Sequence, residues 1–360
     1  MEYTYPLLDR IFDYYYSKRD ASISDYKLYS CMHLLEPQYE MYKRFIKFGF
    51  KAESIVALGK AYSSNKGIIQ ELTALGIRVL QPTFSGQAFD DEHTENCSSI
   101  AQEINENTKN IILDDGGYLI DASKNKKIFF AVEQTSSGFR KLEEVAVNFP
   151  IFNVARSKTK LTQESPIIAR KIFERVTEYT EDKMISSPKV VIIGLGPIGN
   201  ATYQIFKAEG FNVDGFDLEK DKGNMIAYLL EKKPDLVIGA TGRQLFTEKD
   251  FNALENDHPY YLMSVSSSDR EFPVAAYRQN TEVHADVVYK NLTFVNNGFP
   301  ITFKGLRNEL TPVEIEKTIA LLMGSIFEGI TAYPEGNQGF LEIPITLQDL
   351  LNSNGDCGAF

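Results

Sequence analysis

Short apolar runs recur through the first half of the chain, each followed by polar residues or glycine. These runs lie at 54–58, 78–80, 110–113, 127–132 and 150–154. Helix-like stretches such as 66–75 and 97–106 separate several of them. Alternation of short strands with helices predicts a mainly parallel sheet that is covered by helices on both faces.

A second series of apolar runs has the same alternation. Its members lie at 189–193, 211–216, 235–239, 260–265 and 292–295. The segment 166–183 between the two series predicts a connecting helix, because Ser165 precedes Pro166 at a favourable first helical position. The patterns together predict an α/β protein with two Rossmann-like, doubly wound parallel sheets.

Length and charge limit the classes of protein that remain. A chain of 360 residues is long enough for two domains with separate cores. The net charge of −11 argues against nucleic acid or an anionic membrane as a partner. No apolar stretch approaches the roughly 20 residues of a membrane helix, and no secretory signal opens the sequence.

The cysteines and histidines are scattered along the chain. Cys31, Cys97 and Cys357 are widely separated and odd in number, and they match no disulfide framework and no zinc spacing. The four histidines are equally dispersed. We therefore expect a reducing, cytoplasmic environment and no metal site.

A glycine-rich segment follows the strand predicted at 189–193. Gly194–Gly199 reads GLGPIG, a helix follows it, and the next strand ends at Asp217. In this motif the first glycine allows a tight turn, the second admits a pyrophosphate, and the third lets helix and strand pack closely. An acidic residue at the end of the second strand hydrogen-bonds a ribose 2′-hydroxyl, so Asp217 favours NAD over NADP.

The later loops of the same region complete this candidate cofactor site. Thr241 and Gly242 follow the strand at 235–239 in a small-residue loop suited to the nicotinamide half. Asn296 follows the last strand. Its amide is suited to hydrogen-bond the carboxamide, and a role as a turn residue is an equally good interpretation.

Five blocks occur in an order that resembles the S-adenosylhomocysteine hydrolase family. The blocks are Asp114–Gly117, Glu133–Gly138, Phe149–Val154, Ser157–Lys160 and the glycine-rich segment at Gly194. The similarity runs from about residue 50 to about residue 330 and is strongest over 110–242. Dehydrogenases in general do not share the blocks that precede Gly194.

The resemblance implies a domain order and a chemistry. It implies a substrate domain at 1–164, an inserted NAD domain with its hinge helix at 165–298, and a return to the substrate domain at 299–360. Enzymes of this family use NAD to oxidise a ribose 3′-hydroxyl, eliminate a thiol, add water, and reduce the ketone again. Such chemistry needs a hydride acceptor, a base beside the hydroxyl, and polar groups that hold the diol.

The resemblance assigns roles to individual residues of the first domain. Lys160 matches the lysine that assists oxidation of the 3′-hydroxyl, and Asp115 matches an active-site aspartate. Glu164 falls where the family has an aspartate on the ribose hydroxyls, and Gln134 replaces a glutamate that binds the diol. Catalytic roles are thus expected for Lys160, Asp115 and Glu164, and substrate contacts for Gln134 and Asp115.

Further positions are assigned to cofactor and substrate in the same way. Thr135, Ser136 and Ser137 fall on a threonine run that contacts NAD, and Pro197 and Ile198 lie within the glycine-rich motif. The histidine of an early family motif aligns with Lys60, so Lys60 is expected at the substrate.

The chain also departs from the family pattern. Two further family histidines are replaced, one of them by Ser267, and the family's C-terminal Lys/Tyr tail does not match the final segment 354–360. Two hypotheses about function follow. The presence of Lys160 favours the first, and the missing histidines favour the second. The first is an NAD-dependent enzyme that acts on a nucleoside-like substrate, with or without hydrolysis of a thioether. The second is a non-catalytic, NAD-binding regulatory homologue. Either is expected as a homodimer.

Overall fold

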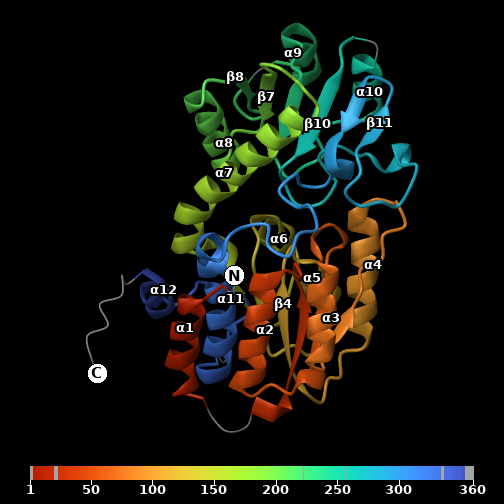
Figure 1. The fold of residues 1–360 in the computed structure, drawn as a ribbon. Coiled ribbons are helices and arrows are strands. Elements are labelled where there is room, and N and C mark those ends of the chain that lie inside the picture. Colours follow the sequence, from red (N-terminus) through yellow and green to blue (C-terminus); the bar gives the residue numbers. More distant parts are fainter. Residues whose placement is uncertain (1–2, 20–22, 222, 256, 334–335, 353–360) are drawn as a thin grey trace. The chain divides into compact units, whose positions relative to one another are not determined.

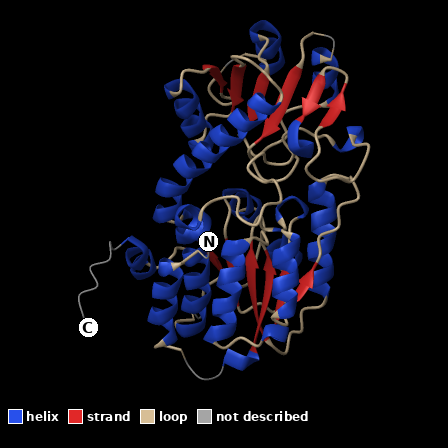
Figure 2. Ribbon diagram, viewed as in Figure 1, coloured by secondary structure: helices blue, strands red, loops and turns tan. Residues whose placement is uncertain are grey.

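The computed structural model describes residues 3–19, 23–221, 223–255, 257–333 and 336–352 (Figure 1). The chain folds into two compact units. The first unit combines 1–82, 93–164 and 306–360, and the second combines 83–92 and 165–305. Each unit contains its own sheet with helices packed against it (Figure 2), so the predicted fold class of two parallel-sheet α/β domains is confirmed.

Two segments lie in a different unit from the one that the sequence suggested. Residues 83–92 and 299–305 both group with the second unit. The physical reason is aromatic packing, since the rings of Phe84 and Phe89 lie 5.5 and 6.0 Å from the ring of Phe299. Such contacts join segments far apart in sequence, and the local pattern of apolar residues carries no sign of them.

The sheet of the first unit has seven strands, and every pair of neighbours is parallel. In spatial order they are β13 (Gly339–Leu341), β6 (Pro150–Asn153), β5 (Phe130–Glu133), β4 (Lys109–Asp114), β1 (Tyr26–Cys31), β2 (Ile55–Leu58) and β3 (Arg78–Leu80). The apolar pattern predicts neither β1 nor β13. Strand β1 lies inside the sheet, between β4 and β2, even though Lys27 and Ser30 interrupt its apolar pattern.

Helices cover both faces of this sheet, because alternate side chains of each strand point to opposite faces. Ile111 and Leu113 of β4 enter one apolar core, and Ile112 enters the other. The first core is closed by α1 (Pro6–Tyr16), α2 (Glu36–Phe48), α3 (Lys66–Ala74), α11 (Pro312–Thr331) and α12 (Ile345–Asn352). The second core is closed by α4 (Phe89–Gln102), α5 (Tyr118–Ala122) and α6 (Ser136–Leu142).

The second unit is built around a six-stranded sheet. Its order is β11 (Val287–Tyr289), β12 (Leu292–Phe294), β10 (Tyr260–Ser264), β9 (Leu236–Gly239), β7 (Lys189–Ile193) and β8 (Asn212–Phe216). Strand β11 pairs antiparallel with β12, and the other pairs are parallel. One face packs on α7 (Lys158–Asp182) and α8 (Pro197–Ala208), and the other on α9 (Met225–Lys232) and α10 (Glu248–Leu254).

Helix α7 begins earlier than the predicted start at Pro166. It starts at Lys158, where the hydroxyl of Ser157 accepts a hydrogen bond from the backbone N–H of Lys160. Pro166 therefore lies inside the helix and removes one backbone hydrogen bond. Burial of Ile172 and Val176 against the second sheet offsets that loss. None of the helices in the described ranges is long and apolar enough to cross a membrane.

Candidate functional site

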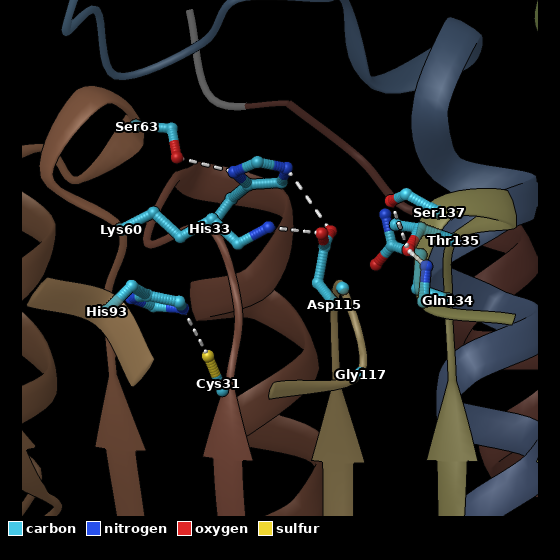
Figure 3. Close-up of polar contacts among 12 residues, drawn as sticks. Cys31, His33, Lys60, Ser63, His93, Asp115, Gly117, Gln134, Thr135 and Ser137 are labelled. Carbon is cyan, nitrogen blue, oxygen red and sulfur yellow. Dashed lines mark hydrogen bonds and ion pairs between the residues drawn. The ribbon is translucent and has the colours of Figure 1, made fainter. Parts of the chain in front are cut away.

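Four polar side chains line the carboxyl edge of the first sheet (Figure 3). His33 follows β1, Lys60 follows β2, Asp115 follows β4 and Gln134 follows β5. These strands are neighbours and run parallel, so their carboxyl ends meet at one edge. Ligands of doubly wound sheets collect at this edge.

Asp115 is the centre of this group. The Nζ of Lys60 forms an ion pair with one carboxylate oxygen, and the Nε2 of His33 lies 3.3 Å from the other. Asp115 and Lys60 are each 1% exposed. Burial alone would raise the pKa of Asp115, but Lys60 and His33 hold that pKa well below its usual value. Asp115 is therefore a carboxylate at neutral pH, fixed by two cationic or polar partners.

His33 is a site residue that the sequence patterns do not predict. They assign this part of the site to Lys60, and the structure adds an imidazole that bridges Asp115 and the hydroxyl of Ser63. The signal for His33 that the sequence offers is its position two residues after the segment that forms β1. Because polar residues obscure that strand, its carboxyl end does not stand out in the sequence.

Lys160 and Glu164 lie beside Gln134. The Nζ of Lys160 donates to the backbone carbonyl of Gln134 at 2.6 Å and lies 3.2 Å from the carboxylate of Glu164, one helical turn further along α7. The side-chain oxygen of Gln134 is buried and has no hydrogen-bond partner within the described residues. An amide oxygen in that state is available to a ligand hydroxyl.

A buried carboxylate, that of Glu133, holds the two loops that carry Asp115 and Gln134. It accepts from the backbone N–H groups of Gly116 and Gly117 at 3.1 and 3.0 Å. It also accepts from the N–H and the hydroxyl of Thr135, both at 2.7 Å. Burial, together with the nearby charge of Asp114, raises the pKa of Glu133 to about 8. Glu133 thus holds the loops of Asp115 and Gln134 in place through hydrogen bonds to their backbone, a role that the sequence does not reveal.

The residues expected to contact a cofactor from the first unit sit at the start of α6. The hydroxyl of Thr135 accepts from the backbone N–H of Gly138 and from the hydroxyl of Ser137, and so caps the helix. Ser136 is exposed. These bonds explain the helix start, and the contact of this segment with a dinucleotide stays a prediction.

The glycine-rich loop of the second unit has the geometry that a diphosphate needs. Gly194 has φ +92°, the left-handed region that allows the tight turn after β7. A Cβ on Gly199 would lie 1.9 Å from the carbonyl oxygen of Gly194, so only glycine lets helix and strand approach this closely. A Cβ on Gly196 would meet no described atom within 4 Å, which leaves open space above the loop. The residues present therefore fit a dinucleotide.

Asp217 and the start of α8 complete the same loop. The carboxylate of Asp217 accepts from the backbone N–H of Leu195 at 3.0 Å and from that of Glu219 at 3.1 Å. Pro197 is the first residue of α8, and Ile198 follows it. The backbone N–H groups at such a helix start favour an anion.

Glu271, another buried carboxylate that the sequence does not mark, organises the loop after β9. It accepts from the backbone N–H groups of Thr241 and Gly242 at 2.6 and 3.0 Å, and from the hydroxyl of Ser264 at 2.8 Å. Like Glu133, it has no recognisable motif, because its partners come from separate parts of the chain. It fixes the backbone where the nicotinamide half is expected.

Asn296 is held by bonds within its own unit. Its Nδ2 donates to the carbonyl oxygens of Pro300 and Phe303, and its Oδ1 lies 2.9 Å from the Nδ1 of His284. Its φ of +54° is typical of an asparagine in a turn. These bonds match the turn interpretation, and its contact with a carboxamide stays a prediction.

Three of the cysteines and histidines come together in the structure, although their spacing in the sequence matches no metal motif. Ligand atoms of Cys31, His93 and Cys97 lie within 4.8 Å of one another, and all three side chains are buried. The structure places them in one core although 66 residues separate Cys31 from Cys97. Cys357 and the final segment lie outside the described residues.

The chain is similar to two uncharacterized proteins and, more weakly, to an adenosylhomocysteinase. No family model matches it. Two proteins of Mycobacterium tuberculosis strains, "Uncharacterized protein MT0113" and "Uncharacterized protein Rv0104", are each 31% identical over an alignment of 332 residues that covers 84% of this chain. The chain spans 63% of their length. The adenosylhomocysteinase of Acinetobacter baylyi is 25% identical over 201 residues, covering 52% of this chain and 41% of that protein.

Solved structures show distant likeness. A dipicolinate synthase chain from Bacillus halodurans has a TM-score of 0.43 and 13% identity, over 86% of this chain and 99% of that one. The 3-phosphoglycerate dehydrogenase of Entamoeba histolytica has a TM-score of 0.43 and 9% identity, over 88% and 100%. The two-unit architecture therefore rests on the strands and helices of the chain itself.

Proposed function

We propose that the chain is an NAD-dependent enzyme that oxidises a secondary, ribose 3′-type hydroxyl of a nucleoside-like substrate. The observation that carries the proposal is the edge of the first sheet, where Asp115 and Gln134 follow neighbouring strands and Lys160 donates to the backbone carbonyl of Gln134. The side-chain oxygen of Gln134 is buried there and has no partner among the described residues. The glycine loop of the second unit adds room for a diphosphate. The similarity to adenosylhomocysteinase over half the chain supports the same interpretation.

The cofactor would be held by the second unit. Its diphosphate would lie on the backbone of Gly194–Gly199, and Asp217 would accept from the ribose hydroxyls and repel a 2′-phosphate. The nicotinamide half would lie at Thr241 and Gly242, with Asn296 of the same unit on its carboxamide. When bound, the nicotinamide supplies the hydride acceptor.

Lys160 would take the proton of the substrate hydroxyl. Nζ of Lys160 would accept the hydroxyl proton and become an ammonium, while the carbinol hydrogen would leave as hydride. Its present bonds to the carbonyl of Gln134 and to Glu164 fix where that nitrogen sits.

Asp115 and Gln134 would hold the diol. Lys60 and His33 keep Asp115 ionised, and an ionised carboxylate accepts two hydrogen bonds from neighbouring hydroxyls. The free acceptor of Gln134 can take another. Glu164 would contribute through Lys160, because their side chains are already paired.

The steps after oxidation of the hydroxyl decide whether the proposed enzyme is a hydrolase or a simple dehydrogenase. If a thiol is then eliminated, water adds to the resulting double bond and the ketone is reduced again, no net NADH would form. If the reaction ends at oxidation, NADH is released. Absorbance of NADH with screened nucleosides and thionucleosides, together with thiol release, separates the two cases.

A non-catalytic NAD-binding regulator is the second candidate. One observation favours it: the two carboxylate oxygens of Asp115 already face Lys60 and His33, so the group is stable without substrate. Lys160→Ala decides between the candidates, with the exposed neighbour Lys158→Ala as the matched control. We expect Lys160→Ala to keep dinucleotide binding and lose hydroxyl oxidation by about 10²–10⁴-fold. Equal turnover in both variants would contradict the enzymatic role.

The remaining partners belong to the same proposal. We propose a small, nucleoside-like substrate and a homodimer, with neither nucleic acid nor membrane as a partner. Sedimentation of the purified chain checks the oligomeric state, and a monomer at all concentrations would contradict it.

A further inference from the structure

A compact group of sulfur and nitrogen atoms lies within the second apolar core of the first unit. Cys31 is the last residue of β1, and His93 and Cys97 lie four residues apart on α4. That spacing places His93 and Cys97 on the same face of the helix. In Figure 3 a dashed line marks the hydrogen bond between His93 and Cys31, near the strand end that carries Asp115.

The distances within this group are those of a metal-binding site. The two sulfur atoms are 3.8 Å apart, and Sγ of Cys31 is 3.0 Å from Nε2 of His93. Two sulfurs bound to a tetrahedral zinc at about 2.3 Å each are about 3.8 Å from one another. The cluster therefore needs little rearrangement to accept an ion.

The surroundings favour a permanent ion over a reactive thiol. The three side chains are at most 1% exposed, and the ring of Tyr118 packs edge-on against His93 at 5.0 Å. Two thiolates and a divalent cation together carry no net charge, which suits an apolar core.

A fourth ligand position has a candidate nearby. Asp114 pairs in parallel register with Cys31, and its Oδ1 is buried without a hydrogen-bond partner in the described part of the chain. Its other oxygen accepts from the backbone N–H of Ile120. Asp114 lies outside the group whose ligand atoms are within 4.8 Å of one another, so its side chain would have to move to reach the ion, and otherwise a water takes that position.

We propose that Cys31, His93 and Cys97 form a structural site for a zinc-class metal ion. Nitrogen and sulfur ligands in this number select such ions over magnesium or calcium. Binding replaces two thiol protons by two metal–sulfur bonds and leaves oxidation states unchanged. The ion would tie α4 to the end of β1, where the carbonyl of Cys31 accepts from the backbone N–H of Asp115 at 2.9 Å. It would thus stabilise the strand end on which the Asp115 loop rests.

The test is cobalt and zinc loading of the full chain under reducing conditions. Because the site is buried, the metal is supplied during expression or refolding, and excess is removed by a mild chelator. We expect about one ion per chain, since a single tetrahedral centre accounts for all the ligands. We also expect a thiolate-to-cobalt charge-transfer band and a higher unfolding temperature with metal. The control Cys357→Ser should behave as the parent chain does, whereas Cys97→Ser and His93→Ala should lose the band.

Each other outcome overturns the proposal. Reduced, folded protein without retained metal would show that the cluster is only a hydrogen-bonded core. A Cys31–Cys97 disulfide, found by mass spectrometry, would assign the sulfurs to redox chemistry. Metal retained unchanged in Cys97→Ser, with circular dichroism like that of the parent, would place the ion elsewhere.

Discussion

The Nζ of Lys60 forms an ion pair with the carboxylate of Asp115, and both side chains are almost completely removed from solvent. Fifty-five residues separate them in the sequence. Removal of one partner leaves the other charge buried and unpaired, which costs more than the pair itself contributes. This pair therefore links the stability of the first unit to the state of the candidate site.

We expect Lys60→Met to lower the free energy of unfolding by about 3–5 kcal/mol. Asp115→Asn should have an effect in the same direction, and the double variant should recover part of the loss because no lone charge remains. Urea denaturation measures all three. Exposed Lys66→Met is the matched control and should change little. Additive losses in the double variant would contradict a direct pairing.

Glu133 predicts a pH dependence of stability. Its folded-state pKa is raised to about 8, above the roughly 4.3 of an unfolded glutamate. A raised pKa gives a stability contribution that is complete below the unfolded value and is lost as pH rises through the folded value. The free energy of unfolding should thus fall between about pH 4.3 and 8, by up to about 1.4 kcal/mol per pH unit from this group.

Denaturation at several pH values checks this expectation. Glu133→Gln should remove most of the slope between about pH 6 and 8, whereas the exposed control Glu143→Gln should keep it. Below about pH 6 part of the slope should stay, because burial also raises the pKa of Asp114 to about 6. An unchanged slope in Glu133→Gln would mean that Glu133 is already ionised in the folded protein, held by its four hydrogen-bond donors.

We expect substitutions at two glycines of the loop to have different effects, one on stability and the other on cofactor binding. Gly199→Ala places a Cβ against the carbonyl of Gly194 and should lower stability by about 1–3 kcal/mol. Gly196→Ala meets no described atom and should leave stability unchanged. It should weaken NADH binding about tenfold or more, because its methyl group occupies the space of the diphosphate. Thermal unfolding and NADH fluorescence separate the effects, and full affinity in Gly196→Ala would refute the assigned site.

Asp217 predicts a change in cofactor preference. Asp217→Ala should weaken NADH binding by about 10–100-fold, the range for losing hydrogen bonds to a charged group. NADPH should bind as well as before or better, because repulsion of the 2′-phosphate is gone. Titration with both dinucleotides gives the ratio, and Asp214→Ala on the same strand serves as control. A ratio that does not move would show that Asp217 only supports the backbone of Leu195.

Much of the fold could be predicted because strands and helices have local signatures. The apolar runs located β7, β9 and β10 to within a residue or two, and the glycine spacing located the start of α8. The apolar pattern does not predict β1, because Lys27 and Ser30 interrupt it, nor does it predict the short edge strands β11 and β13. The start of α7 was misplaced because a buried face outweighed Pro166.

The sequence by itself determined the two α/β sheets, the glycine loop, and the presence of Asp115, Gln134 and Lys160 after strand or helix boundaries, because these depend on the order of neighbouring residues. Only the tertiary structure decided that His33 reaches Asp115, that Glu133 and Glu271 hold loops together, and that Cys31 meets His93 and Cys97. Those contacts join residues that chain topology brings side by side in the core, and no local pattern of hydrophobic and polar positions encodes them.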